Sequence, residues 1–188
     1  MATTSDISKG AFLRYNGELV MITDYTHITP GKGNAIYTVK SRNVQTGRQS
    51  EIRFRSGEKI ELVRVETHEL QYLYQESDSL ICMNQESYEQ IPVPMALFGD
   101  SLKYLKENTI VLVKFDDEDK PVYAEPPTYV ELEVTYTENA VKGDTSSGRV
   151  LKAATIETGA TVNVPLFVEA GEKIKINATT GEYMERVK

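Results

Sequence analysis

The sequence predicts a mostly β protein built from three small β-barrel domains. Short apolar stretches recur at close spacing, and several alternate between apolar and polar residues, as strands with one buried face do. Turn-forming dipeptides separate these stretches. Only the segment after Pro92 is rich in helix formers. The 188 residues therefore suit three units of roughly 60 residues each, the size of an SH3-like or OB-type barrel.

The first predicted domain, residues 1–64, contains strands separated by turns. Glu18–Ile22 is mostly apolar and is expected to be a strand buried on both faces. Glu51–Arg55 alternates, which points Ile52 and Phe54 inward and its two arginines outward. Turns are expected at Asn16-Gly17 and Thr46-Gly47.

A hairpin is predicted between Glu18–Ile22 and a second strand at Ala35–Val39, and its turn carries one lysine. Proline fixes its own φ, and both glycines of the turn are expected to take the positive φ values of tight turns. Lys32 would then project from a narrow tip. Turn chemistry leaves two interpretations open: the lysine acts on a partner, or the turn only reverses the chain. The tip residues are Pro30, Gly31, Lys32, Gly33 and Asn34.

The second predicted domain spans residues 65–127, and Pro126-Pro127 marks its end. It contains a hairpin of Glu69–Tyr74 with Leu80–Met83. A short helical segment follows, and Gly99 is expected to divide it into two pieces.

The third predicted domain spans residues 128–188. Its first strand alternates, with Val130, Leu132 and Val134 on one face, and Lys142–Arg149 is expected to be a polar loop.

Charge is divided unevenly along the chain. Residues 1–64 hold ten Lys/Arg and six Asp/Glu, a balance of +4, whereas the remainder carries −11. A basic N-terminal part favours a polyanionic partner there, and ordinary charge scatter is the alternative. The acidic remainder argues against nucleic-acid binding over the whole surface.

No catalytic or metal-binding constellation is found in the sequence, so we expect neither an enzyme nor a cofactor. His27 and His68 have no ligand spacing and are expected at the surface or at a boundary. Cys82 lies in an apolar run and is expected in the core. Asp116–Asp119 lacks the ligand pattern of a calcium loop and is expected to be a solvated turn. Gly31-Lys32-Gly33 is not a phosphate-binding P-loop, because a strand rather than a helix follows it.

The sequence also favours a cytoplasmic protein. No window approaches the ~18 apolar residues of a membrane span. The N-terminus has no apolar signal region, and a single cysteine fits a reducing compartment.

The whole chain resembles the bacterial elongation factor P family. Seven segments carry the resemblance in the order found in that family: Pro30–Ala35, Phe98–Asp100, Pro126-Pro127 with Tyr129–Glu133, Lys142–Thr145, Lys152–Gly159, Val164–Val168 with Gly171, and Thr180–Val187.

The resemblance implies a KOW/SH3-like N-terminal barrel followed by two OB-folds, in an L-shaped arrangement that mimics tRNA. It also implies a translation factor that binds the ribosome between the peptidyl and exit sites and relieves stalling at consecutive prolines. Ribosomal RNA, peptidyl-tRNA and the exit-site codon are the implied partners, together with an enzyme that modifies the lysine. We expect a monomer with no membrane partner.

The family's modified lysine maps to Lys32. Gly143, Asp144 and Thr145 match the loop near the exit-site codon, and Tyr183 and Arg186 match residues implicated in contact with tRNA or the ribosome. Lys40, Arg42, Arg53 and Arg55 would add salt-sensitive anchoring to RNA.

Two other functions are weighed against this one. A paralogue with the same fold could act as a ribosome- or RNA-binding regulator without rescuing Pro-Pro synthesis. A hydrolase or transferase would need a catalytic cluster that the sequence lacks.

Overall fold

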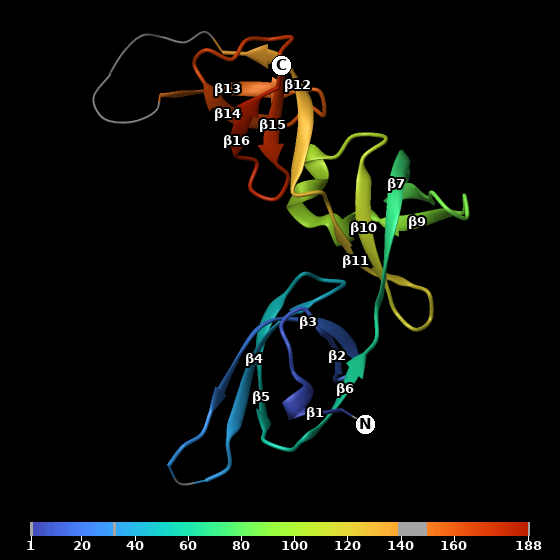
Figure 1. The fold of residues 1–188 in the computed structure, drawn as a ribbon, viewed down its shortest axis with the longest axis vertical. Coiled ribbons are helices and arrows are strands. Elements are labelled where there is room, and N and C mark those ends of the chain that lie inside the picture. The colour runs from blue at the N-terminus through green and yellow to red at the C-terminus, as the bar shows by residue number, and fades with distance from the viewer. Residues whose placement is uncertain (1, 32, 139–149, 188) are drawn as a thin grey trace. The chain divides into compact units, whose positions relative to one another are not determined.

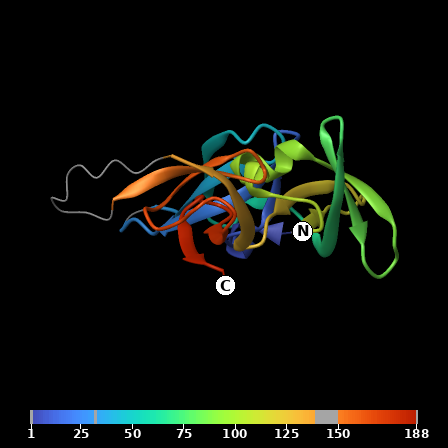
Figure 2. The same cartoon turned by 90° about the horizontal axis from the view of Figure 1, so that it is seen from above.

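The computed structural model describes residues 2–31, 33–138 and 150–187 (Figure 1). By internal contacts the chain divides into two compact units, Met1–His68 with Val113–Ala124, and Glu69–Leu112 with Glu125–Lys188. The described residues form three curled sheets, seen from two directions in Figures 1 and 2, which confirms the mostly β prediction. Within these residues no helix has the length and apolar character needed to cross a membrane.

The N-terminal sheet has six strands in the order β1-β6-β2-β3-β4-β5. Its inward face is apolar, with Leu13, Ile22 and Val39 fully buried. Asn16 and Gly17 both take positive φ, 51° and 81°, so the predicted hairpin turn is confirmed. The elements are β1 (Ala2–Thr3), η1 (Thr4–Asp6), β2 (Phe12–Tyr15), β3 (Glu18–Ile28), β4 (Ile36–Asn43), β5 (Gln49–Arg55) and β6 (Lys59–Val63).

The middle sheet has the order β11-β10-β7-β8-β9. The predicted helical segment is present as a 3-10 helix, and Gly99, at φ 57° and ψ −137°, interrupts it as predicted. The elements are β7 (Glu66–Glu76), β8 (Ser79–Asn84), β9 (Gln90–Pro94), η2 (Met95–Tyr104), β10 (Ile110–Phe115) and β11 (Pro121–Glu125).

The C-terminal sheet has the order β14-β13-β12-β15-β16. When the strands of each sheet are numbered in chain order, the C-terminal sheet and the middle sheet have the same connectivity. The first strand is central, the second and third lie on one side of it, and the fourth and fifth lie on the other. A register shift interrupts the first strand of both, between Tyr72 and Tyr74 and between Val134 and Tyr136. Such bulges increase local twist and help a sheet to curl. The strands are β12 (Tyr129–Thr137), β13 (Leu151–Ile156), β14 (Thr161–Pro165), β15 (Lys173–Asn177) and β16 (Tyr183–Arg186).

The core of the C-terminal sheet includes one residue from η2. Tyr104 is 5% exposed and packs in the cluster with Val130, Leu132 and Ile176. Nearby, the Thr158 hydroxyl donates a 2.6 Å hydrogen bond to the carbonyl of Lys103. The 3-10 helix therefore contributes to the apolar core of this sheet.

Candidate functional site

The lysine-bearing hairpin is longer than the sequence predicts. β3 and β4 pair antiparallel from Val20 and Asn43 to Ile28 and Ile36, and residues 24–28 of β3 are exposed. The hairpin reaches out from the sheet in Figure 1. The prediction that Glu18–Ile22 is buried on both faces is wrong: Val20 and Ile22 are buried, while Leu19 and Met21 are only half-buried, because one face packs on the core.

In the part of the loop between these strands that the structure describes, the residues are exposed to solvent. Pro30, Gly31, Gly33 and Asn34 are all exposed, and Lys32 lies outside the described residues. Gly33 has a φ of +113°, but Gly31 lies outside the left-handed region, so the expectation of two positive φ values is met at one glycine only. A Cβ at Gly31 would meet no atom within 4 Å, and one at Gly33 would reach only the Pro30 ring.

The four basic residues predicted to contact RNA share one face of the hairpin sheet. Lys40 and Arg42 are exposed on β4, while Arg53 and Arg55 are exposed on β5. Cross-strand pairing places Thr38 opposite Arg53, so alternation turns all four side chains away from the core.

This face is not purely basic. Lys40 lies opposite Asp24 on one neighbouring strand and Glu51 on the other. Arg53 Nη2 is 3.2 Å from Glu51 Oε1, with both side chains exposed. Because exposed pairs are screened by solvent, the guanidinium of Arg53 stays accessible to a stronger anion.

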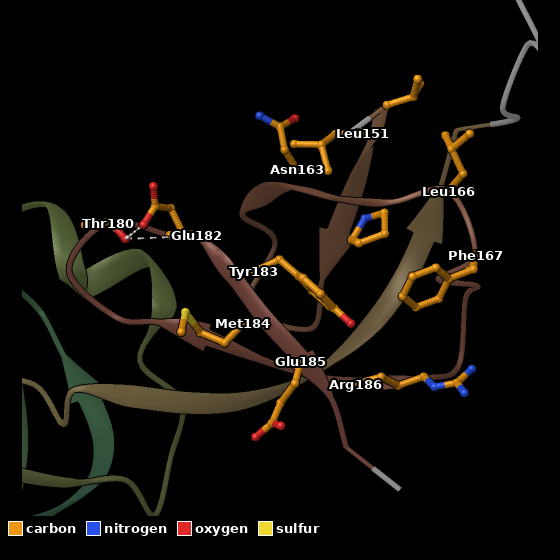
Figure 3. A pocket seen from close by; sticks show the side chains of 13 residues that line it. Leu151, Asn163, Leu166, Phe167, Thr180, Glu182, Tyr183, Met184, Glu185 and Arg186 are labelled. Carbon is orange, nitrogen blue, oxygen red and sulfur yellow. Dashed lines mark hydrogen bonds between the residues drawn. The ribbon is translucent and has the colours of Figure 1, made fainter. Parts of the chain in front are cut away.

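Tyr183 and Arg186 lie on β16 and line a groove of about 1240 Å³ in the C-terminal sheet (Figure 3). Figure 3 shows Phe167 and Arg186 at one end of it, and Thr180 and Glu182 at the other. The groove exposes Leu151, Phe167 and Met184, with Phe167 60% exposed. Gly143, Asp144 and Thr145 lie outside the described residues.

Arg186 is held from two sides. Its Nη1 donates a 2.7 Å hydrogen bond to Glu172 Oε1, and its guanidinium lies over the Phe167 ring, 5.9 Å from the centroid. The backbone N–H of Glu169 lowers the pKa of Glu172, and Arg186 adds to this effect while burial opposes it. Burial raises the pKa of the Tyr183 hydroxyl, so the phenol stays protonated at neutral pH.

Sequence reasoning missed Phe167 as part of this site. It follows the Val164-Pro-Leu run, where an apolar residue is ordinarily read as core. Its exposure depends on the end of β14, and no periodic pattern in the sequence marks that end.

The structure also shows the surroundings of the cysteine and of the acidic turn that the sequence analysis considered. Cys82 is fully buried as predicted, and burial raises the pKa of its thiol to about 11. Asp116 Oδ1 accepts hydrogen bonds from the backbone N–H groups of Glu118 and Lys120, which forms the predicted polar turn. The residues that the structure describes contain no group of three or more His, Cys, Asp or Glu able to hold a metal ion.

Three family models match the chain in consecutive order. They are the elongation factor P KOW-like domain at residues 3–60, the elongation factor P OB domain at residues 65–124, and the elongation factor P C-terminal domain at residues 130–186.

Curated relatives match over the full length of both chains. Elongation factor P of Finegoldia magna is 44% identical over 187 residues, that of Roseiflexus sp. is 43% identical over 188, and that of Flavobacterium psychrophilum is 46% identical over 189, with 100% of each chain covered.

One solved structure, described as eukaryotic translation initiation factor 5A from Methanococcus jannaschii, has a TM-score of 0.54 at 18% identity. The match covers 65% of this chain and 92% of that chain, and it shows a similarity of fold.

Proposed function

The chain belongs to the elongation factor P family, a family of translation factors, and from this membership we propose that it binds the ribosome and promotes peptide-bond formation at consecutive prolines. The observation that carries the proposal is that the likeness extends over the full length of the chain, in the order KOW-like domain, OB domain and C-terminal domain. The three domains are proposed to end at residues 64, 127 and 188.

The proposed working part is the loop that carries Lys32. Its exposed neighbours and the open space around Gly31 support a loop whose backbone can approach an RNA surface closely. Between the peptidyl and exit sites, Lys32 would reach peptidyl-tRNA and hold it in a reactive geometry. Positioning lowers the entropic part of a barrier without an acid or a base, which suits a chain with no recognised catalytic cluster.

The remaining contacts are proposed to anchor the factor. Lys40, Arg42, Arg53 and Arg55 present cations on one exposed face, which suits phosphate binding. Tyr183 and Arg186 would contact tRNA or the ribosome from the C-terminal groove. Gly143, Asp144 and Thr145 are proposed, from the family pattern alone, to lie near the exit-site codon.

The proposal also includes a modifying enzyme that extends Lys32. We further propose that the factor acts as a monomer in the cytoplasm, where ribosomes work. Peptide mass spectrometry of the native protein tests the modification, because an adduct would shift the mass of the peptide that contains Lys32 and of no other peptide.

A reconstituted translation assay with a Pro-Pro-Pro reporter tests the function. The wild-type chain should accelerate synthesis, and Lys32→Ala should reduce that acceleration about tenfold or more while ribosome binding is largely kept. Lys9→Ala, an exposed lysine of the same predicted domain, is the matched control and should remain active.

Two results would count against the proposal. Full activity of Lys32→Ala would exclude the proposed role of the tip. No acceleration by the wild-type chain in its native, modified form, with ribosome binding retained, would favour the regulator without Pro-Pro rescue.

A further inference from the structure

A row of aromatic rings crosses the N-terminal sheet just before the lysine loop. Phe54 on β5 lies opposite Tyr37 on β4, and Tyr37 lies opposite His27 on β3. The rings of His27 and Tyr37 are stacked, with centroids 4.3 Å apart and planes 14° from parallel. Phe54 is 5% exposed within the core, Tyr37 packs against that core, and His27 is exposed. The row therefore runs from the core to solvent.

A bulge explains why His27 takes part in this row. The register of β3 and β4 shifts between Ile22 and Asp24, which leaves Thr23 as an extra residue. Its hydroxyl donates a 3.1 Å hydrogen bond to the carbonyl of Lys40. The shift moves the core side of β3 from even to odd positions, so His27 faces the same side as Ile22.

The row ends at an unpaired edge of the sheet. β2 pairs with β3 only from Glu18 to Met21, so the outer part of β3 has β4 on one side and no described strand on the other. Among the residues that the structure describes, Tyr37 supplies the single ring contact to His27. One face of the imidazole is stacked on Tyr37 of β4, so the opposite face lies on the side of the ring away from β4, where no described strand pairs with this part of β3 and His27 is exposed.

We propose that the outer ring face of His27 is a stacking site for an unpaired base of an RNA partner. The site rests on the proposed function, because it assumes that this hairpin works against RNA. An aromatic ring already fixed by a parallel neighbour loses little freedom when a base stacks on it. Each base stacked on an aromatic ring contributes measurably to single-strand binding, with little dependence on sequence.

Charge favours RNA over an aromatic protein side chain as the occupant. Residues 1–64 carry a balance of +4, although Lys40, Arg42, Arg53 and Arg55 lie on the face of the sheet opposite to His27. His27 is five positions from Lys32 in sequence and lies on the strand that leads into the loop. A base held there would orient the strand of RNA that the loop approaches.

The test uses the full chain and two RNA probes of equal charge, tetraadenylate and an abasic tetramer with the same sugar-phosphate backbone. Fluorescence anisotropy measures affinity, and NMR follows the ring protons of His27. Tetraadenylate should bind about five- to tenfold more tightly than the abasic probe. It should also move the His27 ring protons upfield, because they would lie above a base.

Three variants separate stacking from other roles of the residue. His27→Phe keeps a ring and should bind tetraadenylate within about twofold of wild type, whereas His27→Leu should lose about five- to tenfold. Tyr25→Leu removes a ring of the same strand that lies opposite Val39 and outside the row, and it should change the affinity little. Melting temperatures of all variants show whether each remains folded.

Equal binding of the two probes, or equal loss in His27→Leu and Tyr25→Leu, would overturn the site. Tighter binding of an aromatic tetrapeptide than of tetraadenylate would overturn the choice of RNA. The proposed function can fail separately: an inactive wild-type chain in the Pro-Pro-Pro assay leaves the difference between the two tetramers intact.

Discussion

The outer part of the β3–β4 hairpin and the C-terminal groove both expose an aromatic ring, His27 in the hairpin and Phe167 in the groove, but they are supported in different ways. In the hairpin, residues 24–28 are exposed and are held by cross-strand hydrogen bonds and one ring stack. In the groove, Tyr183 and Arg186 lie on β16, which pairs with β15, and Ile174 and Ile176 of β15 are completely buried.

This difference predicts how function and stability are coupled. Where a strand is held mainly by backbone pairing, an exposed side chain on it can be replaced with little change in the free energy of unfolding. The groove is different, because Arg186 is hydrogen-bonded to Glu172 and Gly181 lies against the buried Tyr104. Substitutions in the hairpin should therefore alter binding alone, and substitutions around the groove should alter folding as well.

Gly181→Ala should have the largest effect on the free energy of unfolding, because it tests the contact between the groove and the core directly. Gly181 has a φ of +73°, and a Cβ there would overlap the hydroxyl of Tyr104 and lie 2.7 Å from its Cζ atom. The left-handed conformation costs an alanine about 1 kcal/mol, and displacing a buried ring adds more. Urea unfolding should show that the free energy of unfolding falls by about 3 kcal/mol.

Gly171→Ala is the matched control for this prediction. It has a similar φ of +88°, and its Cβ would meet no atom within 4 Å. Only the conformational cost of about 1 kcal/mol should remain. If both variants lost the same free energy of unfolding, the contact between residue 181 and Tyr104 would not contribute to the cost.

Glu157→Gln should have an intermediate effect on stability and should change its pH dependence. Burial opposes ionisation of Glu157, but the backbone N–H of Glu133 and the Lys106 ammonium outweigh it and lower its pKa below the ordinary 4.5. The folded state therefore binds this proton less readily than the unfolded state. The stabilisation is complete above about pH 4.5 and is lost as pH falls through the lowered folded value.

Thermal melting from pH 3 to pH 7 measures this effect. Glu157→Gln should cost about 1 kcal/mol at pH 7, a small value because the 3.0 Å pair with Lys106 is partly exposed to solvent. The loss should shrink toward pH 3. A loss that is constant across this range would mean that charge on Glu157 contributes nothing.

Arg55→Gln should have the smallest effect on stability. A large loss of stability would contradict the expectation that substitutions in the hairpin sheet alter binding alone. Arg55 is exposed on the hairpin sheet, so the free energy of unfolding should change by less than about 0.5 kcal/mol. The slope of log affinity against log salt for ribosome binding should fall by about one. Arg64→Gln, at an exposed arginine outside that face, should leave the slope unchanged.

Several local features could be predicted because a single residue decides each of them. Asn16-Gly17 tolerates the positive φ values of a two-residue turn, and Gly99 interrupts a helix wherever the helix lies. The length of β3 could not be predicted in this way. Its outer residues are polar or exposed, and their strand conformation comes from pairing with β4 rather than from their own pattern.

The mostly β class, the family and the residues of the lysine loop can be read from the sequence, because propensity, turn chemistry and motif order are local properties of the chain. Which side chains meet depends on the fold. The bulge at Thr23 moves His27 onto Tyr37, and the ends of β14 and β16 place Phe167 beside Arg186. Register and strand ends depend on pairing between distant segments, and a one-residue shift reverses every side chain that follows it.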